Sequence, residues 1–473
     1  MRTIAGKAAA ALAAVLAAVL IAPQPASAAT QLIANGTFTT GTSGWKQIDK
    51  ATMTAESGRM RVTVGTGATK PWEAMVATTS AITLTPGRSY TLSFDAYATT
   101  AFRAVTTVQY LATPSTNQSL AQDVNLTTSS RRYSFPFVAT ATADPRAEVT
   151  FQVGGSGGTP TVRFDNVSLM ETQSTRPTAL YVSNQSNPAR WVAANAGDSR
   201  AQAIGSNIAN KPIFAWFGGW FTDITLAVDT YVGAAQAQDR LPMLVAYNIP
   251  NRDACAGHSG GGAGDKDAYH AWITEFARAI GNRHAIVVLE PDAVAAAECV
   301  KPENGGPAGQ YAMLADATQV LKAQAPNAWV YLDAGNATWH TADETARRLG
   351  LAGIANTRGF SLNVSNYITT ADTEAYAVQV RNRLSATYGA KPYVIDTSRN
   401  GNGPYVDSTP GDNWCNPPKR KLGVPPAKQS TGAEYVLWVK VPGDSDGPCG
   451  IAPTIPAGTF SPDLAMALIN GNP

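Results

Sequence analysis

The chain has 473 residues, a formal net charge of +2 at pH 7 and a hydrophobic content of 44%. This size and composition exclude a disordered or fibrous chain and leave room for two domains, each with its own core. Only 15% of the residues are charged, and no basic cluster exceeds Lys419-Arg420-Lys421. This excludes nucleic acid as a partner, since phosphate binding needs a concentrated basic face, and a neutral polymer fits better.

The N-terminus predicts export. Residues 1–29 contain basic Arg2 and Lys7, an apolar run from Ala8 to Ala22, and an A-x-A site that ends at Ala28. These are the three parts of a secretory signal peptide. The apolar run is too short for a membrane span, and no later stretch approaches about 18 continuous apolar residues. We therefore expect a secreted, extracellular protein without a membrane partner.

Residues 30–171 predict an all-β domain. Short alternating segments such as RMRVTV, SYTLSFDAYA and TVRFDNVSL are separated by Gly, Pro, Thr, Asp and Asn. This pattern is typical of a jelly-roll β-sandwich. The domain contains no His or Cys that could form a nucleophilic or metal centre, so its expected role is binding. Residues 172–179 are polar, contain a proline and predict a short linker.

Residues 180–473 predict an α/β domain, because apolar strands alternate with helical stretches such as AYHAWITEFARAIG. The predicted strands lie in IFAWFGG, LPMLVAYN, AIVVLEPD, AWVYLDAG, GFSLNVSN, PYVIDTSR and YVLWVKVPG. Since no eighth strand is evident, we predict a distorted, incomplete parallel β/α barrel of about seven strands.

Acidic side chains follow several of these strands. Asp253, Asp292 and Asp446 each come after an apolar strand, and barrel enzymes build their active sites from such loops. Taken singly, Asp292 could cap a helix over AVAAAE, and Asp446 could be a turn residue. Tyr247, Asp333, Asp396 and Lys440 also stand just past strand ends. A ring of this kind at one barrel face favours acid/base chemistry.

The four cysteines all lie in the C-terminal domain, and an even count in an exported chain favours disulfides. Three pairings are possible. We favour Cys255–Cys299 and Cys415–Cys449, because each pair would join loops that carry the acidic residues. The four histidines are scattered, and neither C-x-x-C nor H-E-x-x-H occurs, so we expect no metal and no cofactor in this domain.

Seven sequence blocks in the C-terminal domain carry a family resemblance: YNIPNRDAC, LEPDAV, YLDAGNATWH, NVSNY, IDTSRNGNGP, NWCNP and LWVKVPGDSDG. In these blocks the domain resembles glycoside hydrolase family 6, the inverting cellulases. The resemblance implies a distorted barrel that hydrolyses cellulose or another β-1,4-glucan.

The resemblance implies that Asp292 is the general acid and that Asp253 raises its pKa. A glycosidic oxygen is a poor leaving group, so the acid must keep its proton near neutral pH. Inversion requires a base about 6.5–9.5 Å from the acid, which leaves room for a water molecule. Asp446 is one candidate base, and a relay through a water held near Ser259 is the other. Both routes stay open at this point.

The same resemblance gives roles to residues around the sugar. Tyr247 would distort the sugar ring, Lys440 and Asp444 would bind hydroxyl groups, and Asn363 in the NVSNY block would also contact substrate. Two positions depart from the family pattern. Ala254 separates Asp253 from the following cysteine, and Asn336 stands where a related enzyme has His.

Three tryptophans match sugar platforms of the family, namely Trp191, Trp339 and Trp414. The apolar face of glucose stacks on a flat aromatic ring while its hydroxyl groups reach polar side chains. Outside these motifs a tryptophan is more often partly buried packing. Trp216, Trp220 and Trp272 are assigned to the core, to a loop or to helix packing.

The N-terminal domain resembles the β-sandwich carbohydrate-binding modules of families 4 and 9, since LIANGTFTTGTSGW opens it and VRFDNVSLME closes it. Trp45 and Trp72 are its candidate sugar contacts. Asp165-Asn166 is predicted to be a turn, with a structural calcium site as the alternative. A second alternative is that the sandwich is only a spacer.

The leading functional hypothesis is a secreted, monomeric, inverting endo-β-1,4-glucanase with an appended glucan-binding module. The endo mode is preferred because the stretches after Cys299 and between Asn400 and Trp414 are too short to roof a cleft. An exo-acting cellobiohydrolase is the first alternative. A non-catalytic glucan-binding protein is the second, and the presence of Asp253, Asp292 and Asp446 argues against it.

Overall fold

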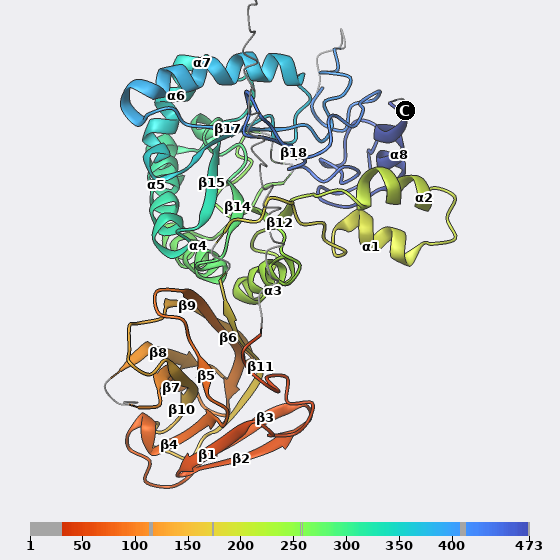
Figure 1. Ribbon diagram of the computed structural model, residues 1–473. Coiled ribbons are helices and arrows are strands. Elements are labelled where there is room, and N and C mark those ends of the chain that lie inside the picture. Colours follow the sequence, from red (N-terminus) through yellow and green to blue (C-terminus); the bar gives the residue numbers. More distant parts are fainter. Residues whose placement is uncertain are drawn as a thin grey trace, which may run out of the picture.

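The computed structural model describes residues 31–112, 117–172, 175–255, 257, 259–406 and 413–471. An all-β domain and an α/β domain lie one beyond the other, and helix α3 (Ile224–Ala237) stands between them (Figure 1). The predicted signal peptide lies outside the described residues. Within those residues, no helix combines the length and apolar character needed to cross a membrane.

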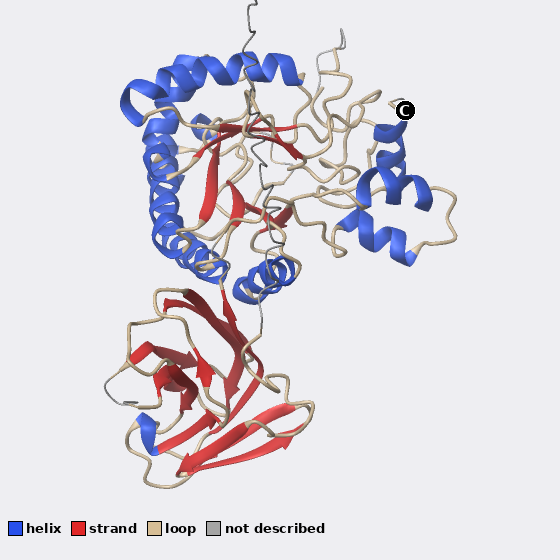
Figure 2. Ribbon diagram, viewed as in Figure 1, coloured by secondary structure: helices blue, strands red, loops and turns tan. Residues whose placement is uncertain are grey.

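Two antiparallel sheets form the N-terminal sandwich (Figure 2). Within the described residues, one sheet has the order β1-β4-β10-β7-β8 with β5 paired to β10, and the other has the order β2-β3-β11-β6-β9. The strands are β1 (Trp45–Asp49), β2 (Ala51–Glu56), β3 (Arg59–Val64), β4 (Ala74–Thr78), β5 (Ile82–Thr83), β6 (Ser89–Ala98), β7 (Phe102–Tyr110), β8 (Gln118–Leu126), β9 (Arg131–Val138), β10 (Arg146–Gln152) and β11 (Thr161–Glu171).

The core of the sandwich lies between these sheets and is rich in aromatic rings. Phe151 of β10 stacks on Phe164 of β11 at 4.2 Å and meets Phe94 of β6 edge-on at 4.7 Å. Alternation of buried and exposed positions is clearest in β3, where Met60, Val62 and Val64 are all buried. The β-sandwich prediction is therefore confirmed.

The C-terminal domain is built on one curled sheet with the order β12-β13-β14-β15-β16-β17-β19-β18 in the described residues. Its strands are β12 (Ala215–Phe217), β13 (Met243–Ala246), β14 (Ala285–Leu289), β15 (Ala328–Asp333), β16 (Gly359–Leu362), β17 (Tyr393–Asp396), β18 (Ala427–Lys428) and β19 (Tyr435–Leu437). Strands β12 to β17 and β19 are parallel, while the short β18 is antiparallel. The predicted incomplete barrel of seven parallel strands is confirmed, with β18 added at its edge.

The helices that cover the outside of this sheet are α3 (Ile224–Ala237), α4 (Lys266–Ile280), α5 (Gly306–Gln324), α6 (Ala342–Leu351) and α7 (Thr370–Tyr388) (Figure 2). Helices α1 (Asn187–Ala194), α2 (Ala201–Ile204) and α8 (Pro462–Asn470) lie together at one side of the domain, near the C-terminus (Figure 1). Side-chain oxygens cap many of their N-termini, as Asp223 does for α3 and Asp265 for α4. Every residue of β13, β14, β16 and β17 is buried, which explains why these strands read as continuous apolar runs.

The two domains share a buried ionic contact. Arg132 of β9 donates from its backbone N to Asp223 Oδ2 at 2.8 Å and from Nε to Asp229 Oδ2 of α3 at 2.9 Å. Arg283 of the barrel also pairs with Asp229 at 2.8 Å. Although burial alone would raise the pKa of Asp229, Arg283 and Arg132 hold it below its usual value. The sandwich is thus fixed to the barrel through a carboxylate shared by two arginines.

The predicted linker is anchored on both sides of the residues that are not described. Thr172 donates from its backbone N to Ser89 O in the sandwich at 2.7 Å. The Arg176 guanidinium lies 3.8 Å from the Trp329 ring centroid and donates to Ala285 O, both in the barrel. The described residues on the two sides of this gap are thus attached to the sandwich and to the barrel, respectively.

Candidate active site

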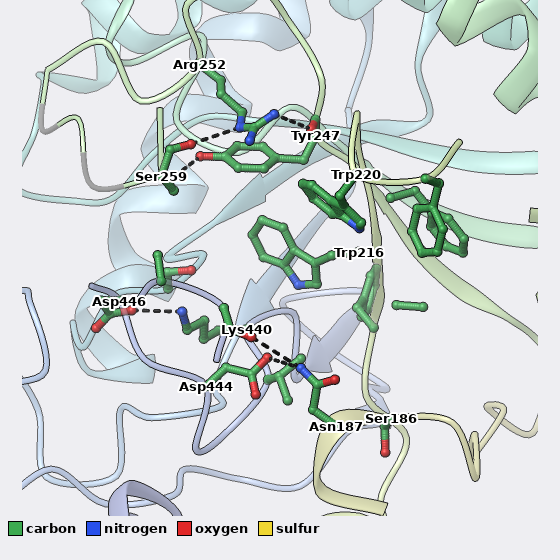
Figure 3. A pocket seen from close by; sticks show the side chains of 18 of the residues that line it. Ser186, Asn187, Trp216, Trp220, Tyr247, Arg252, Ser259, Lys440, Asp444 and Asp446 are labelled. Atoms are coloured by element: carbon green, nitrogen blue, oxygen red, sulfur yellow. Dashed lines mark hydrogen bonds and ion pairs between the residues drawn. The ribbon is translucent and has the colours of Figure 1, made fainter. Parts of the chain in front are cut away.

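A cleft of about 1740 Å³ lies at the carboxyl edge of the parallel sheet, where the loops after the strands converge (Figure 3). Its lining includes Tyr247, Asp253, Asp292, Lys440 and Asp446, which sequence analysis placed just past strand ends. Parallel strands deliver such side chains to one edge, so the fold itself brings these distant residues together. Part of the stretch between Asn400 and Trp414 lies outside the described residues.

Asp292 follows β14 and lines the cleft with a backbone φ of 71°. No described residue donates a hydrogen bond to its carboxyl group, so the alternative of a helix cap is wrong. Burial raises the pKa of Asp292 well above its ordinary value, and the charge of Asp333 contributes more to that increase than the charge of Asp253. Asp292 is therefore a carboxyl group placed to hold and deliver a proton.

Asp333, at the end of β15, is fully buried behind Asp292. Its Oδ2 accepts the backbone N–H of Asp292 at 2.8 Å and that of Gly335 at 3.1 Å, and its Oδ1 accepts Ser361 Oγ at 2.9 Å. Burial raises the pKa of Asp333 to about 7. The sequence placed this residue in the ring but gave it no role. The structure makes it the support of the Asp292 loop.

Asp253 belongs to a short polar chain inside the cleft. Its Oδ2 accepts Ser259 N at 2.7 Å and Ser259 Oγ at 3.1 Å, and the Ser259 hydroxyl lies 3.0 Å from Tyr247 Oη. The Tyr247 ring meets Trp216 edge-on at 5.1 Å. A proton received at Ser259 would thus have a direct hydrogen-bonded path to a carboxylate.

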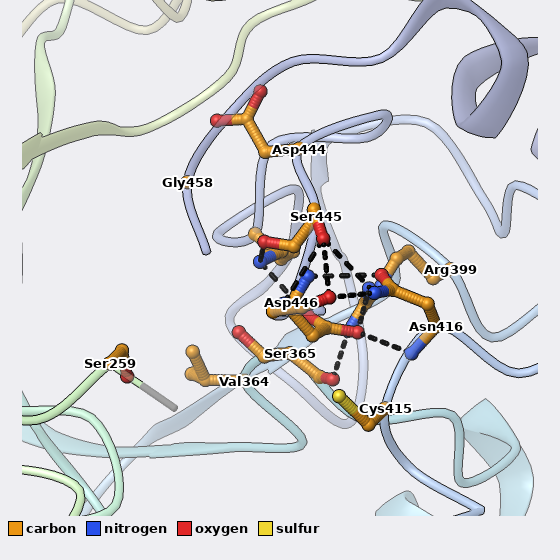
Figure 4. A network of polar contacts seen from close by, with 12 residues as sticks. Ser259, Val364, Ser365, Arg399, Cys415, Asn416, Asp444, Ser445, Asp446 and Gly458 are labelled. Atoms are coloured by element: carbon orange, nitrogen blue, oxygen red, sulfur yellow. Dashed lines mark hydrogen bonds and ion pairs between the residues drawn. The ribbon is translucent and has the colours of Figure 1, made fainter. Parts of the chain in front are cut away.

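Asp446 lies at the centre of a dense network (Figure 4). Its Oδ2 accepts Arg399 Nη1 at 2.8 Å and Asn416 N at 3.0 Å, and its Oδ1 pairs with Lys440 Nζ at 2.9 Å. Burial opposes ionisation, yet Arg399 and Lys440 together hold the pKa of Asp446 well below its usual range. The residue is more than a turn position, because its carboxylate joins three loops.

Lys440 and Asp444 stand on the same side of the cleft (Figure 3). The Lys440 ammonium is directed at Asp446 and also donates to Ser445 O at 3.2 Å. Asp444 Oδ2 accepts Asn187 Nδ2 at 2.8 Å, and burial raises the pKa of Asp444 to about 7. Both polar groups face the cleft, as direct contacts with sugar hydroxyl groups would require.

Some of the tryptophans lie where the sequence predicted and others do not. Trp339 and Trp414 line the cleft, whereas Trp191 does not. Trp191 packs 6.0 Å from Phe460, so the structure does not place it as a platform in this cleft. Trp216 and Trp220, which the sequence assigned to core or loop, both line the cleft. Trp216 lies within β12 and Trp220 just after it, and neither position separates a cleft residue from ordinary packing in the sequence. Trp272 packs between Tyr269 and Phe276, as predicted.

Asn363 corrects another prediction. Its side chain is completely buried, and its Nδ2 donates to Ile368 O at 3.1 Å and to Asp396 O at 3.0 Å. It therefore stabilises the loop after β16 and does not contact substrate. Asn336 does line the cleft, and its Oδ1 accepts both the backbone N–H and the hydroxyl of Thr338.

Both favoured disulfides are present. Cys255 pairs with Cys299 with a Cα–Cα distance of 5.2 Å, and Cys415 pairs with Cys449 at 5.9 Å. The first bond joins the loop of Asp253 to the segment after Asp292. The second joins the loop of Trp414 to the loop that carries Asp446. Each bond therefore fixes two walls of the cleft.

The sandwich residues fall into two groups. Trp45 is 5% exposed and packs on Phe151, so it is a core residue and not a sugar contact. Trp72 is 53% exposed, with the Lys70 ammonium 5.3 Å from its ring. Asp165-Asn166 lies within β11 at a β-bulge, with Asn166 at a φ of 49°, instead of forming the predicted turn.

An acidic, aromatic-lined cleft at the carboxyl edge of a curled parallel sheet defines a hydrolase that acts on carbohydrate. Residues 175–471 match the family described as Glycosyl hydrolases family 6, and residues 30–162 match a family described as Carbohydrate binding domain. The chain belongs to glycosyl hydrolase family 6, and it is a glycoside hydrolase.

Several individual proteins are similar to the C-terminal domain. An endoglucanase of Streptomyces halstedii is 48% identical over 299 residues, which cover 63% of this chain and 90% of that protein. A probable exoglucanase of Podospora anserina is 30% identical over 322 residues, covering 59% and 72%. The solved structure of the endoglucanase Cel6 from Mycobacterium tuberculosis superposes with a TM-score of 0.56 at 36% identity, covering 63% of this chain and 99% of that one.

Proposed function

We propose that this protein is a secreted, monomeric, inverting endo-β-1,4-glucanase that cleaves internal bonds of cellulose or a related β-glucan. Secretion is supported by the signal-peptide pattern of residues 1–29. The endo mode is supported by four relatives named endoglucanase at 40–48% identity. Among more distant relatives, one named probable exoglucanase is 30% identical, two named probable cellobiohydrolase are 28% identical, and one named endoglucanase is 29% identical.

The observation that carries this proposal is the carboxyl group of Asp292. It lines the cleft, and burial together with the charges of Asp333 and Asp253 raises its pKa, which favours the protonated form that a general acid needs. In the proposed reaction, Asp292 gives its proton to the glycosidic oxygen as the bond to the anomeric carbon breaks. Water attacks that carbon from the opposite face, so a β-linkage yields an α-configured product.

We infer that the proton of this water passes through a relay at Ser259 to Asp253, and not to Asp446. The support is electrostatic. Asp446 is held ionised by Arg399 and Lys440, and a carboxylate with so low a pKa is a weak proton acceptor. Asp253 has no such cation pair among the described residues, and it is already hydrogen-bonded to Ser259. Asp446 would then stabilise positive charge developing on the sugar.

The sandwich domain is proposed to bind the glucan and to raise the local concentration of the cleft at the polymer. Its match to a carbohydrate-binding family supports this role. A calcium ion is not needed for this proposal.

The test of the proposal is hydrolysis of carboxymethylcellulose by the mature chain. Viscosity and reducing ends are measured together, and the anomeric form of fresh product is followed by NMR. We expect viscosity to fall well before reducing ends accumulate, with α-anomer formed first. Slow viscosity loss at equal bond cleavage would favour the exo mode, and a β-anomer product would exclude inversion.

A further inference from the structure

The cleft extends beyond the acidic centre in one direction. The same continuous cavity that is lined by Asp292 and Tyr247 is also lined by Trp220, Phe221 and Leu226, at the start of α3. These three side chains are among the large apolar residues that remain exposed, at 51%, 39% and 42%. Exposed aromatic surface that continues a binding cleft marks a place for more ligand.

The Trp220 ring is held in place by its surroundings. A Cβ added at Gly218 would lie 2.3 Å from the Trp220 ring, so the indole packs directly on a backbone that only glycine permits. The Arg252 guanidinium lies 5.5 Å from the Trp220 ring centroid and 5.0 Å from that of Tyr247. Arg252 is itself fixed by its Nε, which donates to Ser259 O at 2.9 Å. The ring is therefore a preformed platform, linked through one cation to the centre of the cleft (Figure 3).

The loop that carries this platform is anchored at its far end. Asp223 caps α3 by accepting Leu226 N at 2.8 Å, and its second oxygen accepts Arg132 N from the sandwich domain. Phe221 packs 5.5 Å from the buried Phe217 ring of β12 and 6.2 Å from Trp220. The exposed rings thus lie on a rigid path between the acidic centre and the docked module.

We propose that Trp220, supported by Phe221, is a distal subsite that binds the apolar face of a glucosyl unit in a long β-1,4-glucan chain. This inference rests on the proposed function, because it extends the occupant of the same cleft. A chain held by the acidic centre would reach Trp220 only if it were long enough. The subsite would therefore favour binding of a polymer over a short oligosaccharide. The bound chain would extend from the acidic centre toward the sandwich domain.

The test compares kcat/KM for cellohexaose with kcat/KM for cellotetraose in the full chain. Hydrolysis is the readout, because the sandwich domain could bind both sugars without cleaving them. In Trp220→Ala we expect the ratio of the two values to fall about tenfold, as loss of one sugar–indole contact would give. Trp220→Phe retains a ring and should stay within about threefold of the wild-type ratio.

Leu351→Ala is the matched control, since Leu351 is an exposed apolar residue at the end of α6, outside the cleft lining. It should keep the wild-type ratio. An unchanged ratio in Trp220→Ala would overturn the proposed distal subsite. An equal loss of kcat/KM on both substrates would also overturn it, because such a loss would show that Trp220 has a structural role. If the wild-type chain cleaves neither oligosaccharide nor polymer, the proposed function itself fails.

Discussion

The backbone N–H of Asp292 donates a 2.8 Å hydrogen bond to Oδ2 of Asp333. This contact holds two carboxyl groups close together, one facing the cleft and one fully buried behind it. Burial raises the pKa of Asp292 most, and the nearby charge of Asp333 raises it further. The pairing therefore favours the protonated form of Asp292, although no described residue donates a hydrogen bond to its carboxyl group.

Asp333→Asn should move the alkaline limb of the pH–activity profile to lower pH. In the proposed mechanism activity needs protonated Asp292, so activity is expected to fall as the pH rises through the pKa of that group. Asparagine keeps an oxygen that can accept the Asp292 N–H but removes the charge, so the pKa of Asp292 should fall. The measurement is kcat/KM against pH on soluble cellulose.

The control for this variant is Asp343→Asn, which removes an exposed carboxylate paired with Arg383 on the outer helices. Its pH profile should match that of the wild type. An alkaline limb that stays in place in Asp333→Asn would show that Asp333 does not set the pKa of Asp292.

Asp446→Asn should destabilise the fold strongly. The change leaves Arg399 and Lys440 without their shared anion in a buried site, and loss of one partner of such a pair costs about 3–5 kcal/mol. The pKa of Asp446 is lowered by folding, so its contribution is complete above its unfolded pKa, about 3.9, and is lost as the pH falls through its lower folded pKa. Denaturant unfolding at pH 7 measures the loss.

Asp463→Asn provides the comparison for that measurement. Asp463 also pairs with an arginine, Arg200, but its side chain is 85% exposed. An exposed pair contributes about 0–1 kcal/mol, so this variant should remain close to the wild type. Equal losses in the two variants would contradict the buried role assigned to Asp446.

Arg132→Ala should uncouple the two domains. The change removes the contacts of Arg132 to Asp223 and Asp229, and it leaves Asp229 paired with Arg283 alone. We expect the wild-type chain to unfold in one calorimetric transition and the variant to unfold in two, the first at a lower temperature. Arg131→Ala, the exposed neighbour on β9, should keep one transition. A single unchanged transition in Arg132→Ala would show that the ionic contact does not join the domains.

Sequence reasoning located the strands of the barrel because they are buried on both faces and therefore appear as uninterrupted apolar runs, as AIVVL of β14 does. Sandwich strands that carry polar residues among the buried apolar ones were harder to predict from the sequence. The segment QSLAQDVNL forms β8, yet only Leu120, Val124 and Leu126 are buried, and its polar residues hide the period of two. The sequence therefore predicted the architecture of the sandwich without all of its strands.

The sequence predicted those residues of the candidate site that follow a recognisable apolar strand. Asp292, Asp253 and Asp446 follow that rule. The hydrogen bond from Asp292 to Asp333 and the docking of Arg132 on Asp229 join residues 41 and 97 positions apart. Such pairings depend on tertiary geometry, which a local pattern does not carry. Trp45 and Trp220 were misassigned for the same reason. Only the burial of each side chain in the folded protein shows that Trp45 is a core residue and that Trp220 is exposed.

The most direct test of the central claim is the activity of Asp292→Asn on two substrates that differ in their leaving group. Cellulose needs a proton on its leaving oxygen, whereas a dinitrophenyl cellobioside releases a stable anion without one. We predict a loss of about 10²–10⁴-fold on soluble cellulose, with much of the activity on the aryl glycoside retained. Full activity on cellulose, or equal losses on both substrates, would contradict the assignment of Asp292 as the general acid.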